Sequence, residues 1–98
     1  MTRDEKIVHI AKHYGFVNQC HICIEEMAEL TQAISKLERA KTQEEKVACI
    51  IHMGEELADV EIMVRQLKYF LGENMTEKEI DQKLDRQLLR IREEKGTC

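Results

Sequence analysis

The chain contains no proline and has only four glycines, two tyrosines and two phenylalanines among its 98 residues. It is therefore poor in the residues that interrupt helices and in the aromatic residues that favour strands. Hydrophobic residues make up 43% of the chain and charged residues 35%, which is typical of a folded protein rather than a disordered one. We predict an all-α fold.

Long apolar runs are also absent. No stretch approaches the run of about 18 residues that a membrane-spanning helix needs, and the first residues lack the apolar segment of a signal peptide. We therefore expect a cytoplasmic protein in which the four cysteines are free thiols. The net charge of −4 provides no overall attraction for nucleic acid or for an anionic membrane surface, so neither is an expected partner.

The length of the chain allows one domain, which we assign to residues 1–98, since domains commonly have about 100 to 150 residues. A domain of this size buries a modest fraction of its surface. Long helices with wide apolar faces therefore often complete their core by association of several copies. We expect a homo-oligomer.

Capping signals and apolar periodicity predict two helices in the first part of the chain. Thr2 with Glu5 forms a capping box at the start of the first helix, which ends at Gly15. Asn18 can cap a second, longer helix that runs to about residue 40.

Two further helices are predicted in the second part. Thr42 with Glu45 gives a second capping box, and the helical pattern then continues to Gly72. Thr76 with Glu79 has the same spacing and opens a fourth helix with an apolar stripe that ends before Gly96.

Two pairs of acids lie on the apolar faces of the second and third helices. At about 100° per residue, Glu26 falls inside the apolar arc of its helix and Glu29 lies on the rim of that arc. Glu56 and Asp59 repeat this arrangement on the third helix. Each helix therefore directs a carboxylate pair, spaced i and i+3, toward the surface where helices pack.

Four converging carboxylates need a positive partner, because a buried, unpaired carboxylate costs several kcal/mol or takes up a proton. Lys36 lies on the rim of the second helix, and the other cations of both helices point away. Oxygen ligands without paired His or Cys favour Mg²⁺ or Mn²⁺ over Zn²⁺. We therefore predict a divalent cation at Glu26, Glu29, Glu56 and Asp59.

A zinc site is the competing interpretation of CxxC at Cys20 and Cys23 and of CxxH at Cys49 and His52. If the two acidic helices are antiparallel with their acids level, these two pairs lie on opposite sides of the acids. They are then about 20 Å apart at 1.5 Å per residue, which disfavours a shared zinc ion.

The pattern EExxE, followed on a later helix by ExxD, resembles the all-α nucleoside triphosphate pyrophosphohydrolases of the MazG-like superfamily. It consists here of Glu25, Glu26 and Glu29, and then Glu56 and Asp59. The resemblance implies a four-helix bundle-like domain whose two long central helices carry the acids and whose core is completed in a homodimer or homotetramer. It also assigns Mg²⁺ binding to the four acids selected by helical phase.

The resemblance extends to residues expected to bind substrate. Gln19 precedes the double glutamate by about two helical turns, and Lys36 follows on the same helix. The family pattern KxxxNxxR corresponds to Lys83, Gln87 and Arg90, with Gln in place of Asn.

The activity implied by the resemblance is hydrolysis of a nucleoside triphosphate between its α and β phosphates, which gives a monophosphate and pyrophosphate. Glu25 is the first candidate for the base that activates water, with Glu55 or one of the metal ligands as alternatives. A different class of function is also open. In a noncatalytic helical interaction module, the acidic helix faces would bind lysines of a partner protein.

Overall fold

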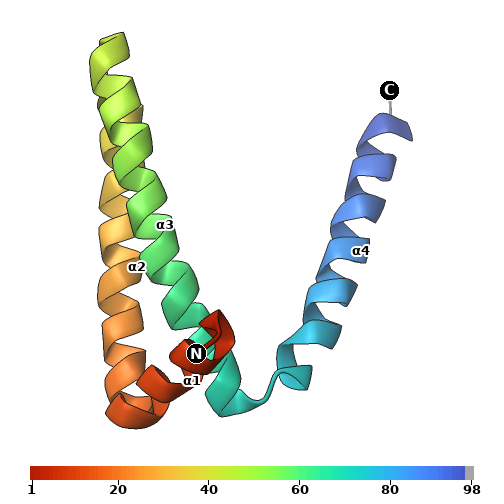
Figure 1. Ribbon diagram of the computed structural model, residues 1–98. Helices are drawn as coiled ribbons and strands as arrows, with labels where there is room; N and C mark the ends of the chain where they lie inside the picture. Colours follow the sequence, from red (N-terminus) through yellow and green to blue (C-terminus); the bar gives the residue numbers. More distant parts are fainter. Residues whose placement is uncertain (97–98) are drawn as a thin grey trace.

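The computed structural model of the protein describes residues 1–96, which form helices without any strand. The prediction of an all-α fold is confirmed. Figure 1 shows the four helices, which are α1 (Arg3–Tyr14), α2 (Phe16–Arg39), α3 (Gln43–Leu71) and α4 (Asn74–Gly96).

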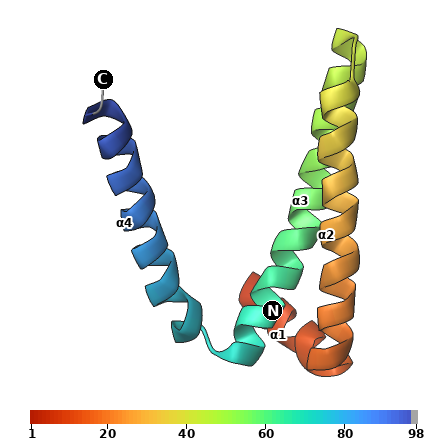
Figure 2. The same ribbon diagram turned by 180° about the vertical axis from the view of Figure 1, so that it is seen from behind.

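The two longest contacting helices, α2 and α3, form an antiparallel pair that provides most of the packing. The short helix α1 lies across one end of this pair and contacts both members. Helix α4 contacts α3 only, and it diverges from the pair in both Figure 1 and Figure 2. The described chain is therefore bundle-like around α2 and α3, but it does not close into a four-helix bundle by itself.

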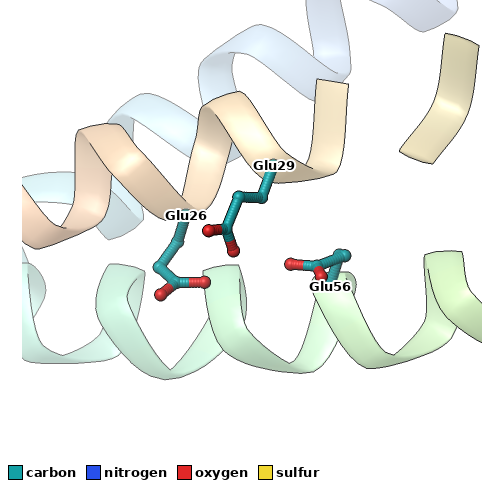
Figure 3. A group of neighbouring side chains, drawn as sticks. All are labelled: Glu26, Glu29 and Glu56. Atoms are coloured by element: carbon teal, nitrogen blue, oxygen red, sulfur yellow. The ribbon is translucent and has the colours of Figure 1, made fainter. Parts of the chain in front are cut away.

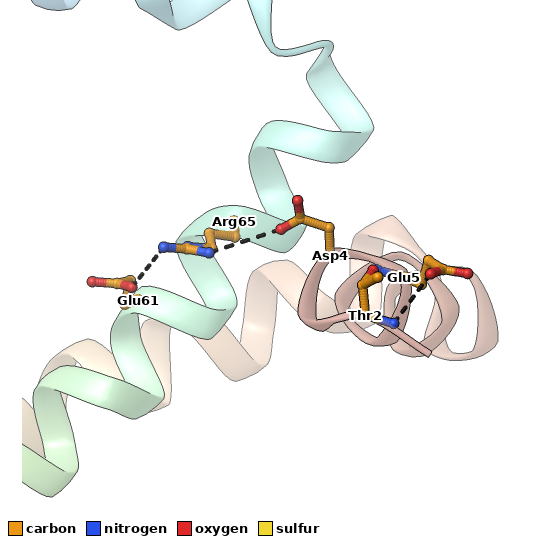
Figure 4. A network of polar contacts seen from close by, with 5 residues as sticks. All are labelled: Thr2, Asp4, Glu5, Glu61 and Arg65. Carbon is orange, nitrogen blue, oxygen red and sulfur yellow. Dashed lines mark hydrogen bonds and ion pairs between the residues drawn. The ribbon is translucent and has the colours of Figure 1, made fainter.

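The start of α1 matches the sequence prediction. The backbone N–H of Glu5 donates to Thr2 Oγ1, and the backbone N–H of Thr2 donates to Glu5 Oε1, both at 3.1 Å (Figure 4). The prediction that Asn18 caps the second helix is wrong, because α2 begins at Phe16. Gly15, with a φ of +88°, turns the chain directly from α1 into α2 without a side-chain cap.

The start of α3 matches the prediction in part. Thr42 Oγ1 accepts a hydrogen bond from the backbone N–H of Glu45 at 3.1 Å. The carboxylate of Glu45, however, accepts from the backbone N–H of Lys41 at 3.0 Å, one residue before the cap. The first bond satisfies a backbone donor that the helix leaves without a partner at its start, and the second ties the preceding residue to the first turn.

Gly72 ends α3 as predicted, with a φ of +93° and its N–H bonded to the carbonyl of Lys68. The prediction that Thr76 opens the fourth helix is wrong, since α4 begins at Asn74. The N–H of Met75 donates to the carbonyl of Gly72 at 3.2 Å, so the chain turns tightly and resumes helical structure at once.

The core of the chain is small and partly polar. Two glutamines, Gln19 and Gln66, are buried at its centre, and their side chains are hydrogen-bonded to each other. The buried hydrophobic residues are Ile7, Ala11, Cys23, Ala33 and Met63. None of the helices in residues 1–96 is long and apolar enough to cross a membrane.

Candidate metal centre

Three carboxylates converge between α2 and α3. Figure 3 shows Glu26 and Glu29 projecting from one helix toward Glu56 on the other. One oxygen from each of the three residues lies within 4.8 Å of the others. The spacing of i and i+3 places the two α2 acids on one face, and the antiparallel packing brings Glu56 opposite them.

The group is partly removed from water. The Glu56 side chain is only 12% exposed, and Glu26 is half-buried. Oε2 of Glu26 and Oε2 of Glu56 are buried and have no hydrogen-bond partner among the described residues. A buried polar atom without a partner costs about 1–3 kcal/mol, and more when it is charged, so these two carboxyl groups favour either a bound proton or a positive partner.

Burial and mutual repulsion raise the pKa values of two of these acids above the ordinary value of 4.5. For Glu26 the largest cause of the raised pKa is desolvation, followed by the negative charges of Glu29, Asp59 and Glu56. For Glu56 desolvation is again first and the charge of Glu29 second, while His52 opposes the rise in pKa. The site therefore disfavours the charged form of both carboxyl groups unless a cation is present.

Asp59, the fourth predicted ligand, is not part of the three-carboxylate group. Its side chain is exposed on α3, one turn from Glu56. Its negative charge nevertheless contributes to the raised pKa of Glu26 and of Glu56. Asp59 therefore lies close enough to act on the group electrostatically.

His52, which belongs to the CxxH pattern, is a neighbour of the three-carboxylate group. Its Nε2 lies 3.7 Å from Glu56 Oε1, and its Nδ1 lies 3.8 Å from Glu55 Oε2. The i,i+4 spacing between His52 and Glu56 is the signal that could have revealed this proximity. When protonated, His52 supplies positive charge on one side of Glu56.

Gln19 faces α3, where it meets a glutamine rather than the acids. Its Nε2 donates to Gln66 Oε1 at 2.8 Å, and its Oε1 accepts from Asn18 Nδ2 at 3.0 Å. Nε2 of Gln66 also points at the sulfur of Met63, at 3.9 Å. The structure therefore uses Gln19 to join α2 to α3 inside the core.

The nearby cations are engaged elsewhere or exposed. Arg65 lies 3.0 Å from Glu61 and 3.9 Å from Asp4, a network shown in Figure 4. Lys36 is exposed and forms no ion pair with any residue of the described chain. The acidic group therefore receives no lysine or arginine from α2 or α3.

The remaining predicted site residues are exposed. Glu25 lies on α2 beside the group, facing solvent. Lys83, Gln87 and Arg90 lie on α4, which makes no contact with α2 and leaves the pair near the end of α3. The structure does not bring these three residues to the acids of their own chain.

The cysteines do not form a metal site among the described residues. Cys20, Cys23 and Cys49 are free thiols, and the metal-capable group found in residues 1–96 consists of acids only. Burial raises the pKa of the Cys23 thiol, with smaller contributions from Cys20 and Glu26, so its metal-binding thiolate form is disfavoured. Cys98 lies outside the described residues.

Comparison with known proteins identifies no relative. No protein-family model, curated protein or solved structure matches the chain. The chemistry of the site therefore has to be judged from its own residues.

Proposed function

We propose that the protein is a Mg²⁺-dependent nucleotide pyrophosphohydrolase that cleaves a nucleoside triphosphate to the monophosphate and pyrophosphate. The observation that carries the proposal is the three-carboxylate group, in which two buried oxygens have no partner. The MazG-like motif that contains these acids supports the choice of reaction. The proposal includes a MazG-type fold completed by oligomerisation and a cytoplasmic location.

The residues present fit Mg²⁺, or Mn²⁺ in its place. All the donors are carboxylate oxygens, which are hard ligands. Oxygens around one Mg²⁺ lie no more than about 4.2 Å apart, twice the bond length of about 2.1 Å. The three carboxylate oxygens of the group lie within 4.8 Å of one another, which is close to this value. Small rotations of the side chains can bring the oxygens to the spacing that Mg²⁺ needs.

The chain would contribute position and charge to the reaction. Glu26, Glu29 and Glu56 would hold the ion between two packed helices, and Asp59 would join them from the rim. When bound, Mg²⁺ would neutralise phosphate charge and lower the pKa of the attacking water. Glu25, or alternatively Glu55, would accept the proton as water adds to phosphorus and the bond to pyrophosphate breaks.

Pyrophosphate release from a panel of canonical and modified nucleoside triphosphates tests this function. With Mg²⁺ present, Glu26→Gln and Glu56→Gln should each lower the rate at least about 100-fold, because each removes a ligand of the ion that activates water. Glu38→Gln, at an exposed position of α2 outside the group, is the matched control and should retain the parental rate.

A magnesium-dependent thermal shift separates this function from the interaction module. A ligand that binds only the folded protein raises its Tm, so Mg²⁺ should stabilise the parent protein and stabilise Glu56→Gln much less. If Mg²⁺ leaves the parental Tm unchanged and no nucleotide yields pyrophosphate, the acidic faces are better explained as a surface for partner lysines.

A further inference from the structure

A groove lies between α1 and α3, on the side of α3 that faces away from the three-carboxylate group. Its volume is about 500 Å³, and eight residues line it, four from each helix. Those on α3 are Ala58, Glu61, Ile62 and Arg65. At about 100° per residue, Arg65 falls about 180° from Glu56 around the axis of α3. The groove and the acids therefore occupy opposite faces of this helix.

The apolar part of the groove is aliphatic. Ile7 is buried, whereas Ile10 and Ile62 are 38% and 42% exposed, and Ala58 adds a small side chain. The eight lining residues include no aromatic side chain, so a nucleobase would find no ring to stack on. An aliphatic ligand fits this surface better, because it gains free energy from burial of apolar area alone.

The polar part of the groove has an excess of positive charge. Arg65 is paired, since its Nη2 lies 3.0 Å from Glu61 Oε2 and its Nη1 lies 3.9 Å from Asp4 Oδ1 (Figure 4). Arg3 and Lys6 also line the groove, and neither forms an ion pair with a described residue. Two positive charges are thus left without a partner, and an anionic group would complement them.

The charges and the aliphatic side chains are separated along the groove. The contact between Arg65 and Asp4 places the first turn of α1 beside residue 65 of α3, so the two unpaired cations lie near this end. Ile10 follows at least one turn further along α1. Ala58 lies seven residues from Arg65, or about 10 Å along α3. The groove therefore combines a cationic end with an aliphatic arm.

The size and charge of the groove favour a small molecule over a protein. A stable protein interface uses about 20–30 residues on each side, whereas eight residues line the groove. A two-fold contact between two copies through the groove would also set Arg3 and Lys6 against the same residues, and opposed like charges disfavour association. Sites for small ligands commonly have volumes of about 300–1,000 Å³, a range that includes this groove.

We propose that the groove between α1 and α3 binds a small aliphatic carboxylate. The carboxylate lies at Arg3 and Lys6, and the aliphatic chain lies along Ile10, Ala58 and Ile62. Because the ligand contacts both helices, it also stabilises the packing of α1 on α3. The site lies on the face of α3 opposite the acids, so it does not depend on the proposed catalytic function.

An NMR titration of the full chain with octanoate tests the proposal. A chelator is present, so that no metal ion at the acids can bind the carboxylate. We expect saturable shifts of the amides in residues 3–10 and 58–65, with a Kd on the order of 1 mM or below. Shifts that do not saturate, or that are equally large along the exposed apolar residues of α4, would indicate non-specific adsorption and overturn the proposal.

Two further ligands separate the contributions of charge and chain. Octylammonium has the same chain with the opposite charge, and acetate has the same charge without the chain. Each should bind at least about tenfold more weakly than octanoate. Equal binding of octylammonium would contradict the role of the cations, and equal binding of acetate would contradict the role of the aliphatic arm.

A matched pair of substitutions on α1 tests the cationic end. Lys6→Glu reverses a charge at the groove and should weaken octanoate binding at least about fivefold. Lys12→Glu makes the same change of charge at an exposed position that does not line the groove, so the Kd should stay within about twofold of the parental value. An equal loss in both variants would mean that only the overall charge matters, which overturns the assignment.

A second pair tests the aliphatic arm. Ile62→Glu places a carboxylate in the arm and should abolish the saturable shifts, whereas Ile24→Glu, at an exposed position of α2 outside the groove, should retain them. Unchanged binding by Ile62→Glu would overturn the proposal. If this variant does not fold, the parent protein and the Lys6→Glu variant still decide. Groove amides that do not respond in the parent, and that exchange slowly with solvent, would show that a second copy covers the groove instead.

Discussion

The α2–α3 pair encloses polar residues, whereas α4 buries none of its residues. Between α2 and α3 lie two glutamines and the partly buried acids Glu26 and Glu56, together with small apolar residues. Helix α4 instead leaves leucines and isoleucines such as Leu84 and Ile91 in water. Folded proteins usually bury the apolar residues and expose the acids. The proposed cation would balance the acids of the pair, whereas no surface within residues 1–96 covers the apolar residues of α4.

The largest expected effect compares an acid of the pair with a cation of α4. If Asp59 is a metal ligand, Asp59→Asn should lower turnover by about 100-fold or more and raise the Mg²⁺ concentration needed for half-maximal rate. Lys83→Ala should mainly raise KM, or lower kcat moderately, with the Mg²⁺ requirement unchanged. Steady-state rates of pyrophosphate release at varied nucleotide and Mg²⁺ concentrations measure both.

Asp59→Asn can also prove to have only the mild effect expected of Lys83→Ala. Asp59 is exposed and lies outside the three-carboxylate group, so its assignment depends on the motif more than on its position. If Asp59→Asn behaves like Lys83→Ala, with normal metal affinity, the acids of α3 do not act together as a metal site. The interaction module would then become the better interpretation.

A second, intermediate effect compares two glutamines of different burial. Gln66 is 1% exposed, and Gln66→Ala leaves the Nε2 donor of Gln19 without its acceptor. The loss should lower the free energy of unfolding by about 1–3 kcal/mol, because a buried donor without a partner carries its desolvation cost. Gln82→Ala, at an exposed position of α4, should change it by less than about 0.5 kcal/mol.

Urea unfolding of the metal-free protein, at equal subunit concentrations, measures these differences. A similar, small change in both variants would mean that the Gln19–Gln66 hydrogen bond does not hold α2 and α3 together. A large change for Gln82→Ala would mean that this face of α4 is covered in solution.

The smallest expected effect is the pH dependence of metal-free stability. The raised pKa of Glu26 and of Glu56 means that the folded protein binds more protons than the unfolded chain, whose carboxyl groups titrate near 4.5. Stability therefore falls as the pH rises from 4.5 through the raised pKa values. Glu56→Gln removes one of these groups and one cause of the raised pKa at Glu26, so its stability should fall less over the same pH range.

Thermal unfolding with a chelator present measures this difference. Glu38→Gln, outside the group, should follow the parent protein at every pH. At neutral pH the metal-free Glu56→Gln protein should be at least as stable as the parent, because the repulsion among the acids is reduced. A clear loss of stability would show instead that the charged Glu56 is held by a cation of the protein, for which His52 is the nearest candidate.

Local signals in the sequence predicted the helices well and their exact starts less well. The capping box of Thr2 and Glu5 and the stop at Gly72 depend on residues within one turn, so the sequence alone contains them. Asn18 and Thr76 carry capping side chains but lie inside helices, because the turns at Gly15 and Gly72 bring the chain into helical structure sooner. A suitable side chain therefore permits a helix start without requiring it.

The residues of the candidate site were predicted only in part, because only some of their features are local to one helix. Helical phase is a local property, and it selected Glu26, Glu29, Glu56 and Asp59, of which the structure brings the first three together. Gln19 has a similar phase, but the packing of α2 against α3 pairs it with Gln66, 47 residues away in the sequence. Helical phase specifies on which face of a helix a residue lies. Its contact partner on the neighbouring helix depends on how the two helices pack.

The sequence by itself determined the all-α class, the order of the helices in residues 1–96 and the faces that carry the acids, since each follows from interactions within a few turns of one helix. Only the tertiary structure decided that α2 and α3 enclose the acids, that Gln19 and Gln66 meet in the core, and that α4 stands apart with Lys83 and Arg90. These features depend on contacts between residues far apart in the chain. The periodicity of a single helix does not determine these contacts, because the same apolar stripe can pack on its own chain or on another.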